Sequence, residues 1–367
     1  MLLNVVLSLL GMVITILLVL GIHESAHFMV ARLFGIKVLR FSIGFGKALY
    51  SWHDRQGTEY VLAAIPLGGY VQMLDENEAT VPEAEKHLAF NQRPLYQRVL
   101  VVLAGPFSNL ILAGFLYWLI FAVGFTTLVP ILEKVDNHSI ASRAGLRAGE
   151  EIVSIDQHET LSWPGISMRL ITHYGDEDSV PIGIKNKESK QIENRSLDLK
   201  GWKMDSLRPD PLTSLGLIPL MPKAKPPPEL IRKIKYPFFA AGAKAFQEVR
   251  DLTYINTVLF GKILELKMSL GSLGGPITIF QTAGFAFENG ALPFLSFLAF
   301  FNVAIGVINF FPIPGLDGGH LLFQAIECIL RRPLSMRVQV IFYRFGFIFL
   351  IFIMAQALAN DLMRMFS

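Results

Sequence analysis

Residues 2–27 read LLNVVLSLLGMVITILLVLGIHESAH, an apolar run that ends in two histidines and a glutamate. The part from 2 to 22 has no charged residue and is long enough to cross a bilayer as a helix. Ionisable side chains at the end of such a helix are costly in lipid and usually mark a functional site. This stretch therefore predicts a membrane-spanning helix that carries a chemically active group.

The composition of the whole chain is that of a membrane protein. Of its 367 residues, 52% are hydrophobic, and the mean hydropathy is +0.45. Three further stretches could span a bilayer: 99–132, 291–316 and 338–358, of which the last is the weakest because it contains Arg344. The net charge is only +3, so no nucleic-acid partner is expected. The single cysteine, Cys328, cannot form an internal disulfide.

Basic residues flank one side of these four stretches, which predicts their orientation. They follow the first span, precede the second and separate the third from the fourth: Arg32, Lys37, Arg40, Arg93, Arg98, Arg331, Arg332 and Arg337. Such flanks are typically cytoplasmic. Both termini and the long segment between the second and third spans are then expected on the outer side, which is the periplasm in a Gram-negative bacterium.

Between the first two spans, short apolar and aromatic runs are broken by glycines, as in GFGK at 44–47 and PLGGY at 66–70. Alternation of such runs with glycine predicts β-hairpins closed by tight turns. GFGK lacks the spacing of a phosphate-binding loop. Its glycines are expected to let the backbone approach another backbone or a substrate.

The outer segment contains the string SRAGLRAGEEIVSIDQHE at 142–159. Its Gly145, Leu146, Gly149 and Glu150 resemble the "AGL..GD.I..I.G" pattern of PDZ domains, with glutamate in place of aspartate. That resemblance implies an α/β domain that binds peptide termini as an added strand. An unrelated small β-rich domain is the alternative. The proline-rich LMPKAKPPPEL that follows predicts a linker, and 235–270 predict an amphipathic helix that lies on the membrane or on the outer domain.

The HESAH string at 23–27 has the HExxH pattern. On a helix, His23 and His27 lie one turn apart on the same face, so both can bind one metal ion. Glu24 is placed to take a proton from water at that ion, whose pKa zinc lowers from 15.7 to about 7. The alternative, that three ionisable groups are merely tolerated here, is disfavoured because such groups are costly in a membrane.

Catalytic zinc usually has three protein ligands, so a third is expected from another span. The string NFFPIPGLDGGHLLF at 309–323 contains Asp317, the only acidic residue between Glu288 and Glu327. Pro312 and Pro314 predict an interrupted helix before it, which is tolerated in a membrane only where it lines a cavity. His320, three residues after Asp317, is a competing ligand.

Taken together, HESAH, GFG, PLGGY, RVLVVLAGPFSN, the PDZ-like string and NFFPIPGLDGGH resemble the site-2 protease family of intramembrane zinc metalloproteases (peptidase family M50), and within it the bacterial sigma-E branch. The resemblance covers almost the whole chain in the same order. It implies one Zn²⁺ per chain bound by His23, His27 and Asp317, with Glu24 as the general base. It also implies substrate contacts by Asn309 and by the hairpin residues Gly44, Phe45, Gly46 and Tyr70.

The resemblance further implies single-span membrane proteins as substrates, with an anti-sigma factor and leftover signal peptides as examples. The protein is expected in the bacterial inner membrane, with its termini and PDZ domain periplasmic and its active site toward the cytoplasm. Relatives in the sigma-E branch carry two tandem PDZ domains, whereas one signature is found here. The second domain is either naturally absent or was deleted.

We therefore expect a polytopic α-helical membrane protein with four transmembrane helices, a membrane-associated β-hairpin region and a periplasmic PDZ-like α/β domain. The expected parts are a first transmembrane helix with HExxH (1–33), a cytoplasmic-side hairpin region (34–95), a second transmembrane helix (96–125), the PDZ domain (126–222), a linker and amphipathic helices (223–290), a third transmembrane helix with the LDG motif and a cytoplasmic loop (291–335), and a fourth transmembrane helix with the C-terminus (336–367).

Two other functions fit parts of the pattern. An ion-conducting transporter would use intramembrane histidines and acids, but it predicts polar residues along several spans, whereas here they cluster at one depth. A non-catalytic scaffold would use only its PDZ domain. Stoichiometric zinc and sensitivity to a chelator distinguish the protease from the scaffold.

Overall fold

The computed structural model describes residues 2–77, 80–186, 191–222, 226–332 and 334–366. Within these residues, four helices are long and apolar enough to cross a membrane: α1 (Leu2–Leu33), α2 (Leu95–Val123), α8 (Ala291–Ile308) and α10 (Met336–Phe366). The predicted four-helix membrane protein is confirmed in this respect. The second span ends nine residues before 132 because Gly124, with φ +91°, breaks the helix.

The chain divides into two compact units, and each is described by itself. The membrane unit comprises residues 1–118, 245–252 and 277–355, and the outer unit comprises residues 119–244, 253–276 and 356–367. The helix α6 (Phe238–Leu264) and α10 each contribute to both units.

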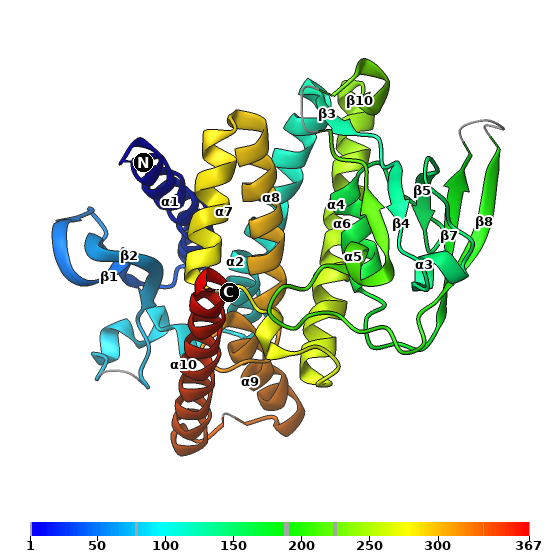
Figure 1. The fold of residues 1–367 in the computed structure, drawn as a ribbon. Coiled ribbons are helices and arrows are strands. Elements are labelled where there is room, and N and C mark those ends of the chain that lie inside the picture. Colours follow the sequence, from blue (N-terminus) through cyan, green and yellow to red (C-terminus); the bar gives the residue numbers. More distant parts are fainter. Residues whose placement is uncertain (1, 78–79, 187–190, 223–225, 333, 367) are drawn as a thin grey trace. The chain divides into compact units, whose positions relative to one another are not determined.

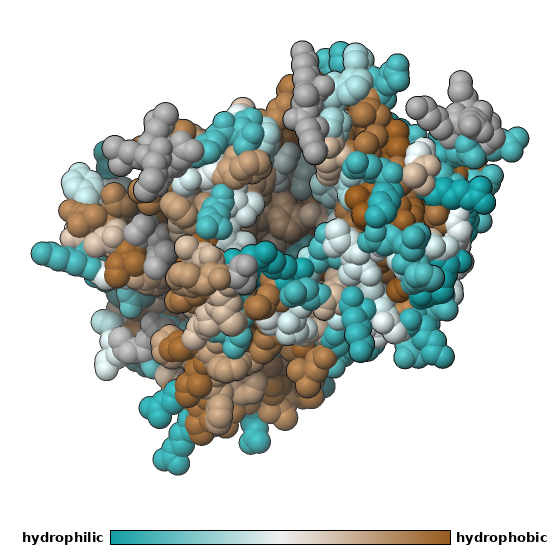
Figure 2. Space-filling view, in the orientation of Figure 1, coloured by the Kyte–Doolittle hydropathy of each residue, from teal (hydrophilic) through white to brown (hydrophobic). Residues whose placement is uncertain are grey.

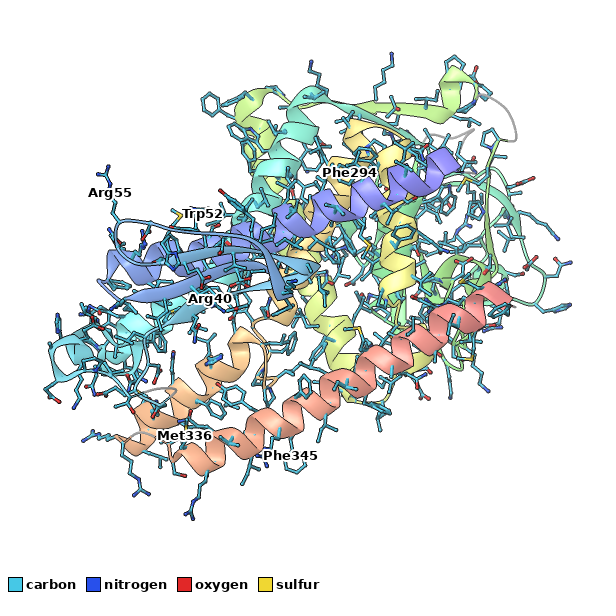
Figure 3. All side chains as sticks on the ribbon, turned by 90° about the vertical axis from the view of Figure 1, so that its left-hand side faces the viewer. Arg40, Trp52, Arg55, Phe294, Met336 and Phe345 are labelled. Carbon is cyan, nitrogen blue, oxygen red and sulfur yellow. The ribbon has the colours of Figure 1, made fainter. Side chains whose placement is uncertain are left out.

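Helices of the membrane unit pack closely at glycines. In α7 (Pro276–Glu288), Gly284 leaves room for Ser8 of α1. In α8, Gly306 lies against the backbone of α2, and a Cβ atom there would be 3.2 Å from the carbonyl oxygen of Pro106. Close backbone approach at small residues is how helices associate in lipid. Apolar side chains of α10 remain exposed, among them Phe345 at 69%, as expected for a surface that faces lipid (Figures 2 and 3).

The loop after α8 positions the start of α9 (Asp317–Leu330). As Pro312 and Pro314 predict, the helix ends before them, at Ile308. The chain then folds back so tightly that a Cβ atom at Gly319 would lie 2.7 Å from the carbonyl oxygen of Ile313, and one at Gly318 would overlap that of Phe311. The glycines of LDGG therefore let the loop and the first turn of α9 touch.

The hairpin region consists of two long, curved strands, β1 (Val38–His53) and β2 (Glu59–Met73), which pair with each other beside α1 (Figure 1). Arg40 pairs with both Gln72 and Glu59, and Ser42 with both Tyr70 and Val61. The first part of β1 therefore lies between two parts of β2, and residues 69–73 form an outer edge. Residues 40–43 match 59–62 in ascending order, whereas residues 48–53 match 63–59 in descending order, so β1 reverses direction at 44–47, where Gly44 and Gly46 have positive φ. The turns predicted at these two glycines and at Gly57 are therefore confirmed. The turn that contains Gly57, at 54–58, joins β1 to β2, and Arg55 projects outward from it (Figure 3).

Two short 3₁₀ turns connect this hairpin to α2, namely η1 (Glu83–Leu88) and η2 (Phe90–Gln92).

The outer unit combines short strands and helices. A four-stranded sheet has the order β6 (His158–Glu159), β5 (Glu151–Ile155), β7 (Ser179–Lys185) and β8 (Ile192–Asp198). Two strand pairs accompany it, β4 (Leu132–Val135) with β9 (Leu217–Pro219) and β3 (Phe125–Leu128) with β10 (Ile231–Ile234). Its short helices are α3 (Ile140–Arg143), α4 (Trp163–Ile171), α5 (Pro211–Leu215), η3 (Pro228–Leu230) and η4 (Leu270–Ser272).

One hydrophobic core runs through residues 132–217 of the outer unit. Ile152, Ile166, Ile182 and Leu215 are fully buried in it. The mixed helix and strand content agrees with the α/β domain predicted for 126–222, while its assignment to the PDZ class stays a prediction. Part of the predicted linker lies outside the described residues, at 223–225, and the rest leads into β10, which is paired with β3.

Candidate metal centre

Three side chains from two helices meet inside the membrane unit. His23 and His27 lie one turn apart on α1 and are 6% and 7% exposed, and Asp317 is the first residue of α9. The Oδ2 atom of Asp317 is 3.1 Å from Nε2 of His23 and 3.4 Å from Nε2 of His27. The two Nε2 atoms are 3.2 Å apart. The structure thus brings together the three residues that the sequence predicted as metal ligands.

These distances fit one tetrahedral zinc ion. With bonds of 2.0–2.1 Å, two ligands of such an ion are about 3.3 Å apart. The three observed separations bracket that value. Moreover, Asp317 Oδ2 is buried yet has no hydrogen bond of acceptable geometry to either imidazole. The three atoms are therefore placed to share a common centre, and the donor set of two nitrogens and one carboxylate oxygen is one that zinc accepts.

The orientation of His27 is fixed by the second transmembrane helix. Its Nδ1 atom is 2.7 Å from the carbonyl oxygen of Val101 on α2. An imidazole that donates Nδ1–H to a carbonyl keeps Nε2 unprotonated and free to bind a metal. Among the described residues, Nδ1 of His23 has no such partner.

Gly105 of α2 lies directly against both imidazoles. A Cβ atom at this position would be 2.7 Å from Nε2 of His23 and would overlap Nε2 of His27. Any side chain would therefore occupy the space of the ligand atoms. The glycine before Pro106 in the AGP string is a signal in the sequence for a close approach, because glycine is costly within a helix unless close approach requires it, but it does not identify the segment that approaches.

A second glycine brings the hairpin to Glu24. A Cβ atom at Gly69 of β2 would lie 2.9 Å from Cγ of Glu24 and 2.9 Å from the carbonyl oxygen of Ser42. The outer edge of the hairpin, residues 69–73, therefore begins at the predicted general base. Sequence reasoning emphasised Gly44 and Gly46 and missed the role of Gly69.

The metal centre opens into a pocket of about 810 Å³. One wall is the hairpin edge from Gly69 to Met73, and another consists of α9 and the start of α10. His23, Glu24, His27 and Asp317 line one end. A substrate in this pocket would contact the hairpin edge and the predicted catalytic groups together.

Only some of the predicted substrate-binding residues lie at the pocket. Tyr70 lines the pocket, and the ring of Phe45 stacks on it at a centroid distance of 6.0 Å. Gly44 and Gly46 lie where β1 reverses direction and do not line the pocket. Asn309 follows the last residue of α8 and is half-buried, also outside the pocket lining.

The competing ligand His320 is not part of the group of ligand atoms that meet. Its Nδ1 and Nε2 atoms are 3.0 Å and 3.4 Å from the hydroxyl of Tyr343 on α10. The structure thus favours Asp317 over His320 as the third ligand.

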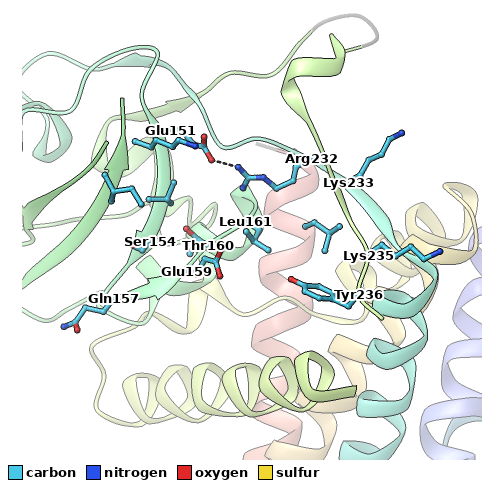
Figure 4. Close-up of a pocket in the computed structure, with 14 residues that line it drawn as sticks. Glu151, Ser154, Gln157, Glu159, Thr160, Leu161, Arg232, Lys233, Lys235 and Tyr236 are labelled. Carbon is cyan, nitrogen blue, oxygen red and sulfur yellow. Dashed lines mark hydrogen bonds and ion pairs between the residues drawn. The ribbon is translucent and has the colours of Figure 1, made fainter. Parts of the chain in front are cut away.

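The outer unit has a cavity of its own, of about 770 Å³, between β5, β6 and β10 (Figure 4). Glu151 and Arg232 form an ion pair of 2.5 Å in its wall. None of the predicted site residues lies there.

The fold and the site therefore define a polytopic membrane protein with a buried metal-ligand group of metallopeptidase type. Comparisons with known proteins agree. The model of peptidase family M50 matches residues 11–353. Protease RseP of Yersinia pestis is 34% identical, with 98% of this chain and 99% of the relative aligned. The regulator of sigma-E protease RseP of Escherichia coli strain K12 is 35% identical, with 97% of each chain aligned.

The chain belongs to peptidase family M50 and is a zinc metalloprotease. The resemblance to site-2 proteases that the motifs indicated is thereby confirmed.

Proposed function

We propose that this enzyme hydrolyses peptide bonds of single-span membrane proteins inside the membrane, with His23, His27 and Asp317 holding one zinc ion and Glu24 acting as general base. The observation that carries the proposal is the mutual spacing of the three ligand atoms, 3.1 to 3.4 Å, on helices that are 294 positions apart in sequence from His23 to Asp317. Ionisable side chains that meet inside a membrane are costly, so they are usually kept for a function.

When bound, zinc supplies a Lewis acid for the peptide carbonyl and lowers the pKa of water. The protein's own residues supply the rest. Glu24, next to His23 and against Gly69, accepts a proton from the attacking water and returns it to the leaving amine. The hydrogen bond of His27 to Val101 keeps its free nitrogen directed at the centre.

Substrate binding is proposed to use the hairpin edge. A transmembrane helix hides its carbonyls in hydrogen bonds, so the substrate must unwind before cleavage. An extended segment can pair with residues 69–73 as an added strand, which places its backbone beside Glu24. Tyr70, supported by Phe45, contacts its side chains, and the turn at Gly44 and Gly46 positions Phe45. Asn309, at the end of α8, is proposed to hold the substrate chain nearby.

The protein is proposed to lie in the bacterial inner membrane with its termini and outer unit in the periplasm and the metal centre toward the cytoplasm, as the basic flanks predict. Residues 126–222 are proposed to form a PDZ domain that binds peptide termini. The alignment with the Yersinia protein spans 447 positions against 367 residues here, so at least 80 positions have no counterpart in this chain. That difference supports a single PDZ domain here, where the resemblance to the sigma-E branch implies two.

The physiological substrate is proposed to be an anti-sigma factor in an envelope stress response, because the relatives are named as regulators of sigma E. Remnant signal peptides, which are also single apolar spans, are proposed as additional substrates.

The test uses purified full-length protein in detergent and a model single-span substrate. Wild type is expected to cleave it, phenanthroline to abolish cleavage and added zinc to restore it. Glu24→Gln is expected to lower the rate by a factor of about 10² to 10⁴, because a positioned general base contributes that much. Cleavage at the wild-type rate by Glu24→Gln would refute the proposal, and zinc-free protein that is indifferent to the chelator would support the scaffold instead.

A further inference from the structure

The pocket continues beyond the metal centre along a polar face of α9. Asp317, His320, Gln324 and Glu327 all line it, and their spacing of three, four and three residues places them on one side of the helix. At 1.5 Å per residue, this face extends about 15 Å from the metal centre. The helix leads toward the basic loop that contains Arg331 and Arg332.

The opposite wall follows the same direction. The hairpin edge begins at Gly69, against Glu24, and continues through Met73 to Asp75, which also lines the pocket. Both walls end at Arg98 of α2. Its guanidinium is 2.9 Å from Glu327, and it interacts electrostatically with Asp75. The pocket is therefore a channel that runs from the metal centre to Arg98.

Within this channel, Gln324 has an unused hydrogen-bonding group. The residue is 5% exposed, and its Oε1 atom has no partner among the described residues. Glu327, by contrast, accepts bonds from Arg98 and from the backbone N–H of Leu334. A buried polar atom without a partner destabilises the protein, and that cost is recovered when a ligand supplies a donor. The terminal torsion of an amide side chain is soft, so its oxygen can turn toward the channel.

The position of Gln324 along α9 determines which substrate residue it can contact. It lies seven residues along α9 from Asp317, which corresponds to about 10 Å. An extended chain paired with the hairpin edge advances about 3.3 Å per residue. The third residue from the cleaved bond, counted toward Arg98, is then level with Gln324.

We propose that Gln324 forms a specificity subsite for a substrate side chain with a hydrogen-bond donor, such as threonine or asparagine, at about the third residue on the Arg98 side of the cleaved bond. This inference rests on the proposed function, because it assumes that substrate is cleaved at the metal centre.

The experiment compares threonine with valine, which have nearly the same shape, at each of five positions on that side of the bond in a model single-span substrate. The bond is identified by mass spectrometry of the products. When the varied residue is the third from the bond, within one residue, purified wild type is expected to cleave the threonine substrate with a kcat/KM about fivefold higher than that of the valine substrate. At the other positions we expect equal values for the two substrates. One hydrogen bond is worth a factor of this order.

Gln324→Leu is expected to abolish the preference for threonine, and Gln281→Leu, the same change at an exposed position on α7, to keep it. Zinc content reports whether each variant has folded. If Gln324→Leu loses zinc, Gln324→Glu decides, because its carboxylate should newly favour lysine over methionine at that position. Absence of a threonine preference in wild type, its persistence in folded Gln324→Leu, or no gain for lysine with Gln324→Glu would overturn the inference. Failure of the proposed function is distinct, because neither substrate would then show zinc-dependent cleavage.

Discussion

The interior of the outer unit and the interior around the metal centre differ in kind. The core between 132 and 217 is a single cluster of buried apolar side chains, such as Ile152 and Leu215. Around the metal centre, His23 and His27 are buried beside the glycines that approach them, and Nδ1 of His23 and Oδ2 of Asp317 lack hydrogen-bond partners among the described residues. The apolar cluster next to them is small, with Ala31, Ile36, Val38 and Val101 buried.

This difference follows from the two solvents. In water, burial of apolar surface stabilises a domain by about 25 cal/mol per Å², so the outer unit has a conventional core. In lipid, apolar side chains gain little by burial, and helices associate through close packing at small residues. A polar group inside the membrane unit therefore contributes to chemistry more than to stability. Changes near the metal centre should abolish function, whereas changes in the core of the outer unit should lower its stability.

The largest effect is expected when the space beside Gly105 is filled. Gly105→Ala places a Cβ atom where the imidazole nitrogens of His23 and His27 lie, so we expect loss of zinc and a fall in cleavage of more than about 100-fold. Gly114→Ala on the same helix is the control, because a Cβ atom there meets only Val249 at 4.0 Å. Metal analysis and a cleavage assay measure both. Zinc retention and normal cleavage by Gly105→Ala would show that the approach of α2 does not shape the site.

A change in the core of the outer unit should have the opposite effect, lowering stability and leaving the metal in place. Ile166→Ala removes a fully buried side chain of α4 and should destabilise the outer unit by about 2–5 kcal/mol. Ile192→Ala, at a position 64% exposed, should change stability by less than about 0.5 kcal/mol. Thermal unfolding and limited proteolysis follow stability, and zinc content should be unchanged in both variants. Loss of zinc with Ile166→Ala would contradict the separation of roles.

A smaller effect is expected at the hairpin edge. Tyr70→Ala removes an aromatic ring that lines the pocket and stacks on Phe45, so KM should rise about tenfold while zinc stays bound. Tyr50→Ala is the matched control, because Tyr50 is 64% exposed on the same hairpin and does not line the pocket. Equal KM values for the two variants would remove Tyr70 from the substrate site.

The smallest effect concerns an ion pair of the outer unit. Burial raises the pKa of Asp176, but hydrogen bonds from Lys262 at 2.7 Å and from Lys267 outweigh burial and lower the pKa below its ordinary value. A lowered folded-state pKa gives stability that is present above the unfolded pKa of about 3.9 and is lost as pH falls through the folded value.

Asp176→Asn should therefore cost about 1 kcal/mol or less at pH 7 and nothing at pH values below the folded pKa. The exposed neighbour Asp178→Asn serves as the control in the same thermal unfolding series. A loss of stability with Asp176→Asn that did not diminish on acidification would contradict the ion-pair account.

The parts of the fold that depend on local pattern could be predicted from the sequence. Apolar stretches predicted four spans, and HExxH on one of them placed His23 and His27 one turn apart on a helix with Glu24 beside His23. The interruption at Pro312 and Pro314 marked the loop before Asp317. These features follow from hydropathy and backbone chemistry alone.

Contacts between distant segments could not be predicted in this way. The position of the first part of β1 between two parts of β2 depends on register, which strands interrupted by glycines specify weakly. The roles of Gly69 and Gly105 depend on which segment approaches them, and a glycine's own neighbours in sequence do not tell this. The choice between Asp317 and His320 likewise depended on the direction in which α9 leaves its loop.

The most direct test of the central claim, that His23 and His27 share one zinc ion with Asp317, is the zinc content of purified wild type, Asp317→Ala and His320→Ala, measured by mass spectrometry of the metal. We predict one zinc ion per chain in wild type and in His320→Ala, and loss of zinc in Asp317→Ala. Retention of zinc by Asp317→Ala together with its loss from His320→Ala would contradict the account.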